Sequence, residues 1–346
     1  MKSKDNKFSR RNFIKKAYFG ATGVIAYSLL PLNKGSRAEV EEIISPRQGL
    51  GNLFLKDGKP LLIVAEGDDR IERLKKALDK IGGIEKLVKG KSVILKPNAV
   101  APTPYPVCTE PNFLISIAKI VKDCGAKEIA IYDSVPQRTF RLMGLYEKAK
   151  KIGAEAIAVN PADDSAFTDV KKEGWIVQNP IGLSNHLAKA DVVINICNIK
   201  RHDEAGFTCA LKNHFGSVRG SNRWDGHLKL HNGKSIDSGE WNEEFRIPFR
   251  MLAAEFADAV RCELNIVDAQ DLLTVSGPYL TRGKVKKGIN KLIISGDIVA
   301  TDAYCSKLMA ENDSTYKTEI WEPALEHAEK LGLGTANLKN VELIEV

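Results

Sequence analysis

Short apolar runs alternate with amphipathic stretches along most of this chain, and this pattern constrains the fold more than any other feature of the sequence. The runs are apolar almost throughout, as expected for strands that are buried on both faces of a sheet. They cover residues 61–65, 93–95, 129–132, 156–159, 192–196, 264–267 and 292–294. Stretches with helical periodicity lie between them, for example 71–81, 113–123 and 140–152. The alternation predicts an α/β fold with a mostly parallel sheet flanked by helices.

The predicted α/β domain spans residues 60–346, and a polar lead-in over 39–59 precedes it. A chain of this length buries a substantial core, as one large domain or as two intimate lobes. Residues 202–248 interrupt the alternation with many glycines among Lys, Arg, His, Asn and Trp. We expect this segment to be a long polar insertion over one edge of the sheet, and insertions of this kind are commonly functional.

The N-terminus has the three regions of an export signal. Two adjacent arginines, Arg10 and Arg11, precede an apolar stretch over 17–32, and small residues follow up to Ala38. We therefore expect residues 1–38 to be a twin-arginine signal, handled by the twin-arginine translocation machinery and signal peptidase. The mature chain would then work beyond the inner membrane, in the periplasm or further out. The apolar stretch is short for a span of about 20 residues, so membrane contact is expected only if the signal is retained uncleaved.

The basic character of the chain is concentrated in this signal. Residues 1–38 hold nine Lys or Arg and one acidic residue, whereas the whole chain holds 51 Lys or Arg and 44 Asp or Glu. The remainder therefore has 42 basic and 43 acidic residues, a net charge of −1. This balance argues against nonspecific nucleic-acid binding. The six cysteines contain no Cys-x-x-Cys pair, so a ferredoxin-type iron–sulfur motif is absent from the sequence.

Polar side chains follow several of the predicted strands. In an open α/β sheet, ligands bind outside the carboxyl ends of the strands, so these side chains are expected to converge on one site. Each of them is also compatible with an ordinary turn or helix cap. They are Lys96, Asn98, Asp133, Ser134, Asn198, Lys200, Arg201, His202, Asp268 and Asp297.

Cationic and imidazole side chains are concentrated between residues 200 and 219. Arginine and lysine bind carboxylate or phosphate, and histidine transfers protons near neutral pH. We predict catalytic roles for His202, His214, Lys200 and Lys212. We predict substrate-binding roles for Lys96, Asn98, Thr109, Arg201, Asn213 and Arg219. The expected ligand is a small anion, with Asp133, Asp268 or Asp297 orienting an imidazole or holding a metal. A solvated charged face is the alternative.

Two histidines have the spacing of metal ligands. His227 and His231 are four residues apart, so a helix would place both on one face. Cys108, in a proline-rich loop, is a third candidate ligand. No glutamate follows the first histidine, which excludes the zinc-protease signature. Hydrogen bonds from loop histidines to carbonyl groups are the alternative. The cofactor is therefore left open, with a metal ion as the candidate.

Several short motifs together resemble the bacterial and archaeal family called domain of unknown function 362. They are Lys96-Pro97-Asn98, Cys108-Thr109-x-Pro111, Ala190-Asp191-Val192-Val193-Ile194-Asn195, Lys200-x-His202 and Ala210-Leu211-Lys212-Asn213-x-x-Gly216. The resemblance runs from about Leu61 to Met309 and implies the fold. It implies little mechanism, since the family's activity is not settled. Members often carry export signals or fused iron–sulfur modules. Arg201 departs from the small polar residue that members more often have there.

A more distant likeness, of architecture alone, is to the nickel-cofactor lactate racemase family, in which His and Lys surround a metal-bound cofactor. Three functions remain open at this point. The first is an enzyme for a small anionic substrate. The second is a noncatalytic metal or cofactor carrier, accessory to an envelope redox system, which would retain a metal or chromophore through purification. The third is a solute-binding protein, which would close around its ligand without turnover.

Overall fold

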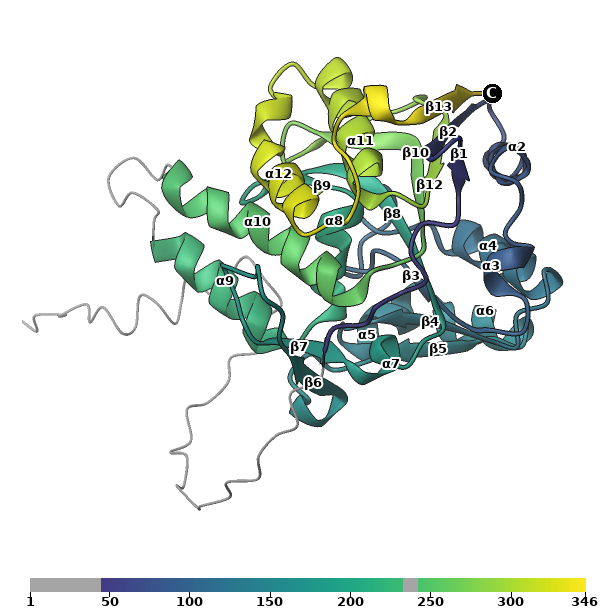
Figure 1. Cartoon of the computed structure of the whole chain (residues 1–346), viewed down its shortest axis with the longest axis horizontal. Helices are drawn as coiled ribbons and strands as arrows, with labels where there is room; N and C mark the ends of the chain where they lie inside the picture. The colour runs from purple at the N-terminus through teal and green to yellow at the C-terminus, as the bar shows by residue number, and fades with distance from the viewer. Residues whose placement is uncertain (1–44, 233–241) are drawn as a thin grey trace, which may run out of the picture. The chain divides into compact units, whose positions relative to one another are not determined.

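The computed structural model describes residues 45–232 and 242–346, and the signal predicted at 1–38 lies outside this part of the chain. Within it, one large mixed sheet has the strand order β1-β2-β12-β10-β8-β3-β4-β5, with β13, β11 and β9 paired to β2, β10 and β8 (Figure 1). The central strands are β2 (Lys59–Glu66), β3 (Ser92–Lys96), β4 (Glu128–Asp133), β5 (Glu155–Ala158), β8 (Val192–His202), β10 (Leu264–Thr274) and β12 (Lys291–Ser295). Each of the seven predicted apolar runs lies in, or within one residue of, one of these strands.

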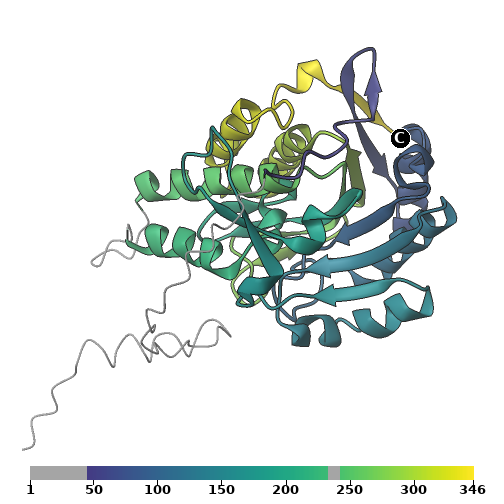
Figure 2. The same ribbon diagram turned by 60° about the horizontal axis from the view of Figure 1, so that its bottom comes forward.

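The strands β5, β4, β3, β8 and β10 are mutually parallel, and β12 is antiparallel to its neighbours β10 and β2. Figure 2 shows the blue-to-teal strands of this parallel group side by side. The carboxyl ends of β3, β4, β8 and β10 therefore meet at one edge of the sheet. The predicted α/β fold with a mostly parallel sheet is confirmed.

Both faces of the sheet are buried, and this explains the continuously apolar strands. Successive residues of a strand point to opposite faces, so Leu61 and Ile63 join one core and Leu62 and Val64 the other. The first core lies under α2 (Arg70–Lys80), α3 (Glu85–Val88), α4 (Pro111–Asp123), α5 (Gln137–Leu142) and α6 (Leu145–Lys151). The second lies under α8 (Ala210–Asn213), α10 (Glu243–Val260), α11 (Ile298–Asn312) and α12 (Glu322–Lys330). Figure 1 shows the first group at right and the second at left.

The helix predicted over 140–152 is two helices, because Gly144 has a φ of +68° and separates α5 from α6. The remaining elements are peripheral. They are β1 (Leu55–Lys56), β6 (Phe167–Val170), β7 (Ile181–Ser184), α7 (Asn185–Ala188), β11 (Lys284–Lys286) and β13 (Glu342–Glu345). Within the described residues, no helix is both long and apolar enough to cross a membrane.

The described parts of the segment over 202–248, residues 202–232 and 242–248, are built into the fold. The segment contains β9 (Gly206–Thr208), α8, a 3-10 turn over His214–Ser217 and α9 (Gly220–Asn232), and both of its predicted boundaries fall inside elements, β8 and α10. The strand β9 pairs with the last residues of β8, so the segment begins at the edge of the sheet where the carboxyl ends of the parallel strands meet. The chain therefore places these polar residues directly above the carboxyl ends of the parallel strands.

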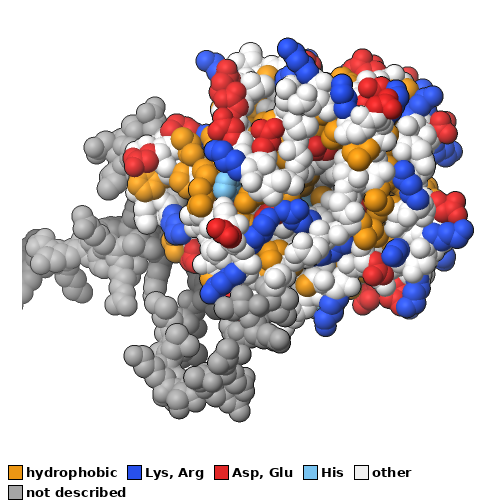
Figure 3. Space-filling view, in the orientation of Figure 1, with side chains coloured by type: hydrophobic (Ala, Val, Ile, Leu, Met, Phe, Trp, Pro, Cys, Tyr) orange, Lys and Arg blue, Asp and Glu red, His pale blue; other side chains and the backbone are white. Residues whose placement is uncertain are grey.

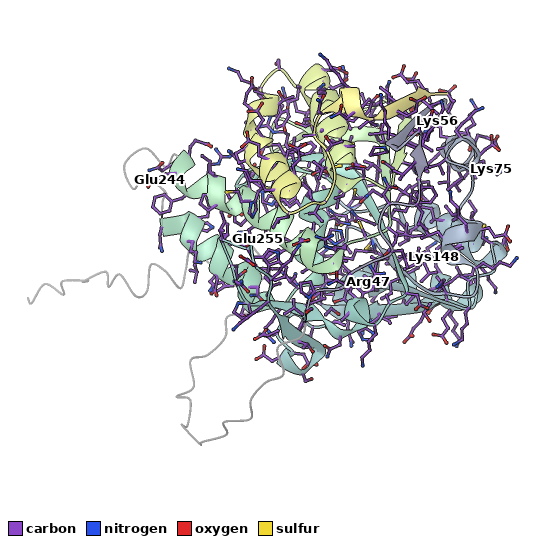
Figure 4. All side chains as sticks on the ribbon, in the orientation of Figure 1. Arg47, Lys56, Lys75, Lys148, Glu244 and Glu255 are labelled. Carbon is purple, nitrogen blue, oxygen red and sulfur yellow. The ribbon has the colours of Figure 1, made fainter. Side chains whose placement is uncertain are left out.

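Two buried charged residues tie peripheral segments to this frame (Figure 4). Glu255 of α10 accepts hydrogen bonds from the backbone N–H groups of Ile176, Val177 and Gln178, and it contacts His327 of α12. Arg47, in the predicted lead-in, forms a 2.8 Å ion pair with Glu263. Charges of both signs are interspersed on the face shown in Figure 3, consistent with the balanced composition outside the signal.

Candidate functional site

A buried ion pair lies at the carboxyl ends of β3 and β4, at the base of the candidate site. Lys96 is the last residue of β3 and Asp133 the last of the adjacent β4, and Lys96 Nζ lies 2.9 Å from Asp133 Oδ2. Both side chains are almost completely buried. Burial lowers the pKa of Lys96 and raises the pKa of Asp133, and the attraction within the pair opposes both shifts. The register of two parallel strands therefore sets this pair.

Gly216 packs directly on the pair. A Cβ atom at this position would lie 2.1 Å from Asp133 Oδ1 and 2.7 Å from Lys96 Nζ. The backbone N–H of Ser134 donates to the Gly216 carbonyl at 3.0 Å, which holds the two segments together. Any larger residue at position 216 would displace the ion pair, which explains the glycine at the end of this motif.

Lys200 of β8 lies beside the pair and is held by the proline-rich loop. Its Nζ donates to Asn98 Oδ1 at 3.0 Å and to the Val107 carbonyl. Thr109 Oγ1 accepts from the Asn98 N–H at 2.8 Å and donates to the Ile196 carbonyl at 3.1 Å, which fixes the loop on β8. Burial lowers the pKa of Lys200 to about 8. Asn98 and Thr109 thus position Lys200.

Asn213 and His214 are two further buried residues of the site. Asn213 Nδ2 donates to Asn195 Oδ1 at 2.7 Å and makes longer contacts to the carbonyls of Lys96 and Pro97. His214 is fully buried, and its Nδ1 lies 3.1 Å from Ser217 Oγ. Its Nε2 has no partner within the described residues, and burial lowers its pKa to about 3. His214 is therefore neutral and sealed inside the protein, away from solvent.

Lys212 has the fewest hydrogen-bond partners of the buried lysines in the site. Its side chain is only 8% exposed, and its Nζ lies 4.2 Å from the centre of the Phe215 ring. No residue in the described part of the chain accepts a hydrogen bond from it. Burial lowers the pKa of Lys212 to about 7; Glu204 opposes this shift, and Lys200 and Arg223 add to it. This ammonium group has an aromatic support but no counterion in contact.

His202, at the end of β8, lies close to Lys212. Its Nδ1 accepts the backbone N–H groups of Glu204 and Ala205, both at 3.2 Å. Burial lowers the pKa of His202 well below its ordinary value, and Lys212 contributes to the shift. The ring is therefore neutral at pH 7, and because Nδ1 is the acceptor, Nε2 carries the hydrogen. Within residues 45–232 and 242–346, backbone groups and no carboxylate orient this imidazole.

Glu204 connects the end of β8 to α9. Its Oε2 lies 2.9 Å from His227 Nδ1 and its Oε1 lies 2.8 Å from His231 Nε2. One ligand atom from each of the three residues lies within 4.8 Å of the others. Burial alone would raise the pKa of Glu204, but the neighbouring histidines lower it well below its usual range. The structure thus shows a His, His, Glu cluster of the kind that binds metal ions.

Two predicted arginines lie outside the site, and Cys108 lies near Lys200 and away from the predicted metal ligands. Arg201 forms a 2.9 Å ion pair with Asp313, and Arg219 forms one of 2.7 Å with Asp169, so neither cation faces the site. Cys108 is buried, and its thiol donates to the Ala101 carbonyl at 2.9 Å, so the structure does not bring it to the two histidines.

The three predicted orienting carboxylates contact no imidazole. Asp133 pairs with Lys96 as described, Asp268 forms a 3.0 Å ion pair with Arg70, and Asp297 caps the N-terminus of α11. Each carboxylate contacts a cation or backbone N–H groups, although Asp133 Oδ1 has no hydrogen-bond partner among the described residues.

Two residues of the site had not been singled out from the sequence. Arg223 of α9 donates to the carbonyl and hydroxyl of Ser134, at 3.0 and 2.6 Å. It lies four and eight residues before His227 and His231, and this helical spacing is visible in the sequence. Glu204 follows His202 by two residues, but nothing in the local sequence shows that a tight turn places it against α9.

The profile of the family described as Domain of unknown function (DUF362) matches residues 93–307, more than half of the chain. The chain belongs to this family. The matched range includes each residue of the site described above. A curated relative, the thylakoid-associated protein sll1697 of Synechocystis sp., is 26% identical over 275 residues, which cover 78% of this chain and 77% of the relative.

A solved structure, the lactate racemase apoprotein from Thermoanaerobacterium thermosaccharolyticum, has a TM-score of 0.40 and 15% identity to this chain. The similarity covers 72% of this chain and 58% of the racemase chain.

Proposed function

We propose that this DUF362 protein is an exported enzyme that acts on a small anionic substrate, a carboxylate or a phosphate, at the carboxyl ends of β3, β4 and β8. The observation that supports the proposal most is Lys212. Its ammonium group is buried against Phe215 without a hydrogen-bond acceptor among the described residues. A mostly buried ammonium group without a hydrogen-bond acceptor is unfavourable, and a bound anion would supply a partner.

The charge around the site favours an anion. Lys96, Lys200, Lys212 and Arg223 lie close enough to influence one another's titration, and the Asp133 carboxylate is already paired with Lys96. We assign the anion to the space beside Lys212, where the neighbouring Lys200 and Arg223 add positive charge. The neutral His202 would present its Nε2–H group to the substrate as a hydrogen-bond donor or proton source. In this proposal Asn98, Thr109, Asn213 and His214 position the cations and do not touch substrate.

We further propose that Glu204, His227 and His231 bind a divalent metal ion. Two imidazole nitrogens and one carboxylate oxygen are a common protein ligand set of catalytic zinc sites, which leave a position open for water or substrate. A metal bound there would supply a Lewis acid close to Lys212. The same cluster favours the second candidate function, a noncatalytic metal or cofactor carrier.

Anion binding tests the main proposal. The full-length chain would be titrated calorimetrically with oxalate, pyruvate, lactate and inorganic phosphate, in parallel with the variants Lys212→Met and Lys229→Met. Lys229 is a matched control, because it lies exposed on α9. We expect at least one anion to bind the wild type and Lys229→Met equally, and to bind Lys212→Met at least about tenfold more weakly, as loss of a charged contact predicts. Equal affinities in all three proteins would contradict the proposal.

Elemental analysis and an absorption spectrum test the metal. We expect a near-stoichiometric metal in protein purified without chelator, and its loss in Glu204→Gln. A metal-bound protein that turns over none of the anions but transfers its metal to an acceptor would favour the carrier. The proposed location is tested by fractionating cells that express the chain with Arg10→Lys and Arg11→Lys, which should retain it in the cytoplasm.

A further inference from the structure

The three buried lysines of the site differ in what their ammonium groups contact. Lys96 Nζ contacts Asp133 and donates to the Pro97 carbonyl. Lys200 Nζ donates to Asn98 Oδ1 and to a backbone carbonyl. These contacts use the protons of a charged ammonium group and hold it in place. Lys212 Nζ has no such contact within the described residues, and it lies over the Phe215 ring at 4.2 Å and near the Phe249 ring at 5.7 Å.

Burial and the neighbouring cations favour the free amine of Lys212, whereas the two aromatic rings favour its charged form. Most of the side chain is buried, and the neighbouring Lys200 and Arg223 repel its charge, while Glu204 opposes the shift. A pKa of about 7 leaves about half of the side chain unprotonated at neutral pH. A lysine in an apolar pocket beside another cation is the arrangement that activates amines as nucleophiles. A lysine that served only to attract anions would gain nothing from losing its charge.

We propose that Lys212 is a covalent nucleophile that forms an imine with the carbonyl group of a small 2-oxo acid or carboxylated aldehyde. This inference rests on the proposed anion site and names its substrate class. The neighbouring cations Lys200 and Arg223 would attract the carboxylate of such a compound, with its carbonyl carbon next to the Lys212 amine. His202 Nε2–H is the nearby neutral donor for the carbonyl oxygen.

The step is balanced without an oxidant or reductant. The lone pair of Nζ attacks the carbonyl carbon, and the carbon–oxygen π electrons move to oxygen, which takes a proton that Nζ gives up. The resulting carbinolamine expels this oxygen as water with a second proton, supplied by His202 or by solvent, and a protonated carbon–nitrogen double bond forms. The protonated imine then withdraws electrons from the bonds of the adjacent carbon, which is the use of lysine imines in catalysis.

Reductive trapping tests the inference. The full-length chain would be incubated with pyruvate or glyoxylate and sodium cyanoborohydride, which delivers hydride to the imine carbon and makes the link permanent. Peptide mass spectrometry would then locate the adduct. We expect the label on Lys212 in preference to the exposed Lys229, with more label as the pH rises through about 7, because the free amine is the reactive form. Lys229→Met should label normally and Lys212→Met should not.

The outcomes separate this inference from the proposed function. Calorimetric binding of pyruvate without label on Lys212 overturns the imine and leaves the anion site standing. Neither binding nor label for any of the anions overturns both. Label spread over exposed lysines, with no enrichment at Lys212, also overturns the imine. If Lys212→Met does not fold, the position of the label in the wild-type chain still decides the question.

Discussion

The ion pair between Lys96 and Asp133 makes a quantitative prediction about stability. Asp133→Asn leaves the buried Lys96 ammonium group without its carboxylate, and Lys96→Met leaves the buried carboxylate without its cation. Breaking a buried pair by removing one partner costs about 3–5 kcal/mol, whereas replacing both partners is often nearly neutral. We therefore expect the double variant to be no less stable than either single variant. The coupling free energy should be at least about 3 kcal/mol.

Urea unfolding of the full-length chain, followed by circular dichroism and tryptophan fluorescence, measures each free energy. The pair Glu85–Lys89 is a matched control, because its atoms lie at a similar distance, 2.7 Å, but both side chains are more than 60% exposed. Its coupling should be only about 0.3–0.5 kcal/mol. If the free-energy changes of the two single variants sum to that of the double variant within about 0.5 kcal/mol, Lys96 and Asp133 do not interact as a buried ion pair.

Three further predictions concern Gly216, Lys212 and Glu204. Gly216→Ala should destabilise the chain by about 1–3 kcal/mol in the same urea assay and weaken anion binding, because its Cβ would strike Asp133; unchanged values would contradict the packing. Lys212 has a native pKa of about 7 but titrates near 10.5 when unfolded, so the native chain binds fewer protons between these values. Wild type should therefore gain about 1.4 kcal/mol per pH unit over Lys212→Met from about pH 8 to 10, and a constant difference would refute the shift. Glu204→Gln should lose bound metal by elemental analysis, whereas Glu244→Gln, exposed on α10, should keep it.

Much of the fold follows from periodicity, because a strand buried on both faces must be apolar at successive positions. The runs at 61–65 and 129–132 are of this kind, and both are central strands. Periodicity does not predict the part of a strand that carries polar side chains. The strand β8 continues through Lys200, Arg201 and His202, since pairing with β9 and β10 holds these polar residues extended. The helix break at Gly144 depends on a backbone conformation that helical periodicity does not reveal.

The position of several residues in the candidate site could be predicted from the order of strands and loops. Lys96, Lys200, His202 and Lys212 follow strands or lie in the glycine-rich segment, where the carboxyl ends of a parallel sheet bring them together. The carboxylate that pairs with each cation cannot be predicted from the neighbouring sequence. Arg201 finds its carboxylate at position 313, more than one hundred residues away, and this pairing removes it from the site. The contact of Glu204 with α9 depends likewise on a tertiary turn.

A crystal structure of the protein soaked with the anion that binds most tightly in calorimetry tests the central claim most directly. The account predicts difference density within hydrogen-bond distance of Lys212 Nζ, beside the Phe215 ring and above the Lys96–Asp133 pair. Density at another surface, with Lys212 Nζ bonded to a carboxylate of the protein itself, would contradict it.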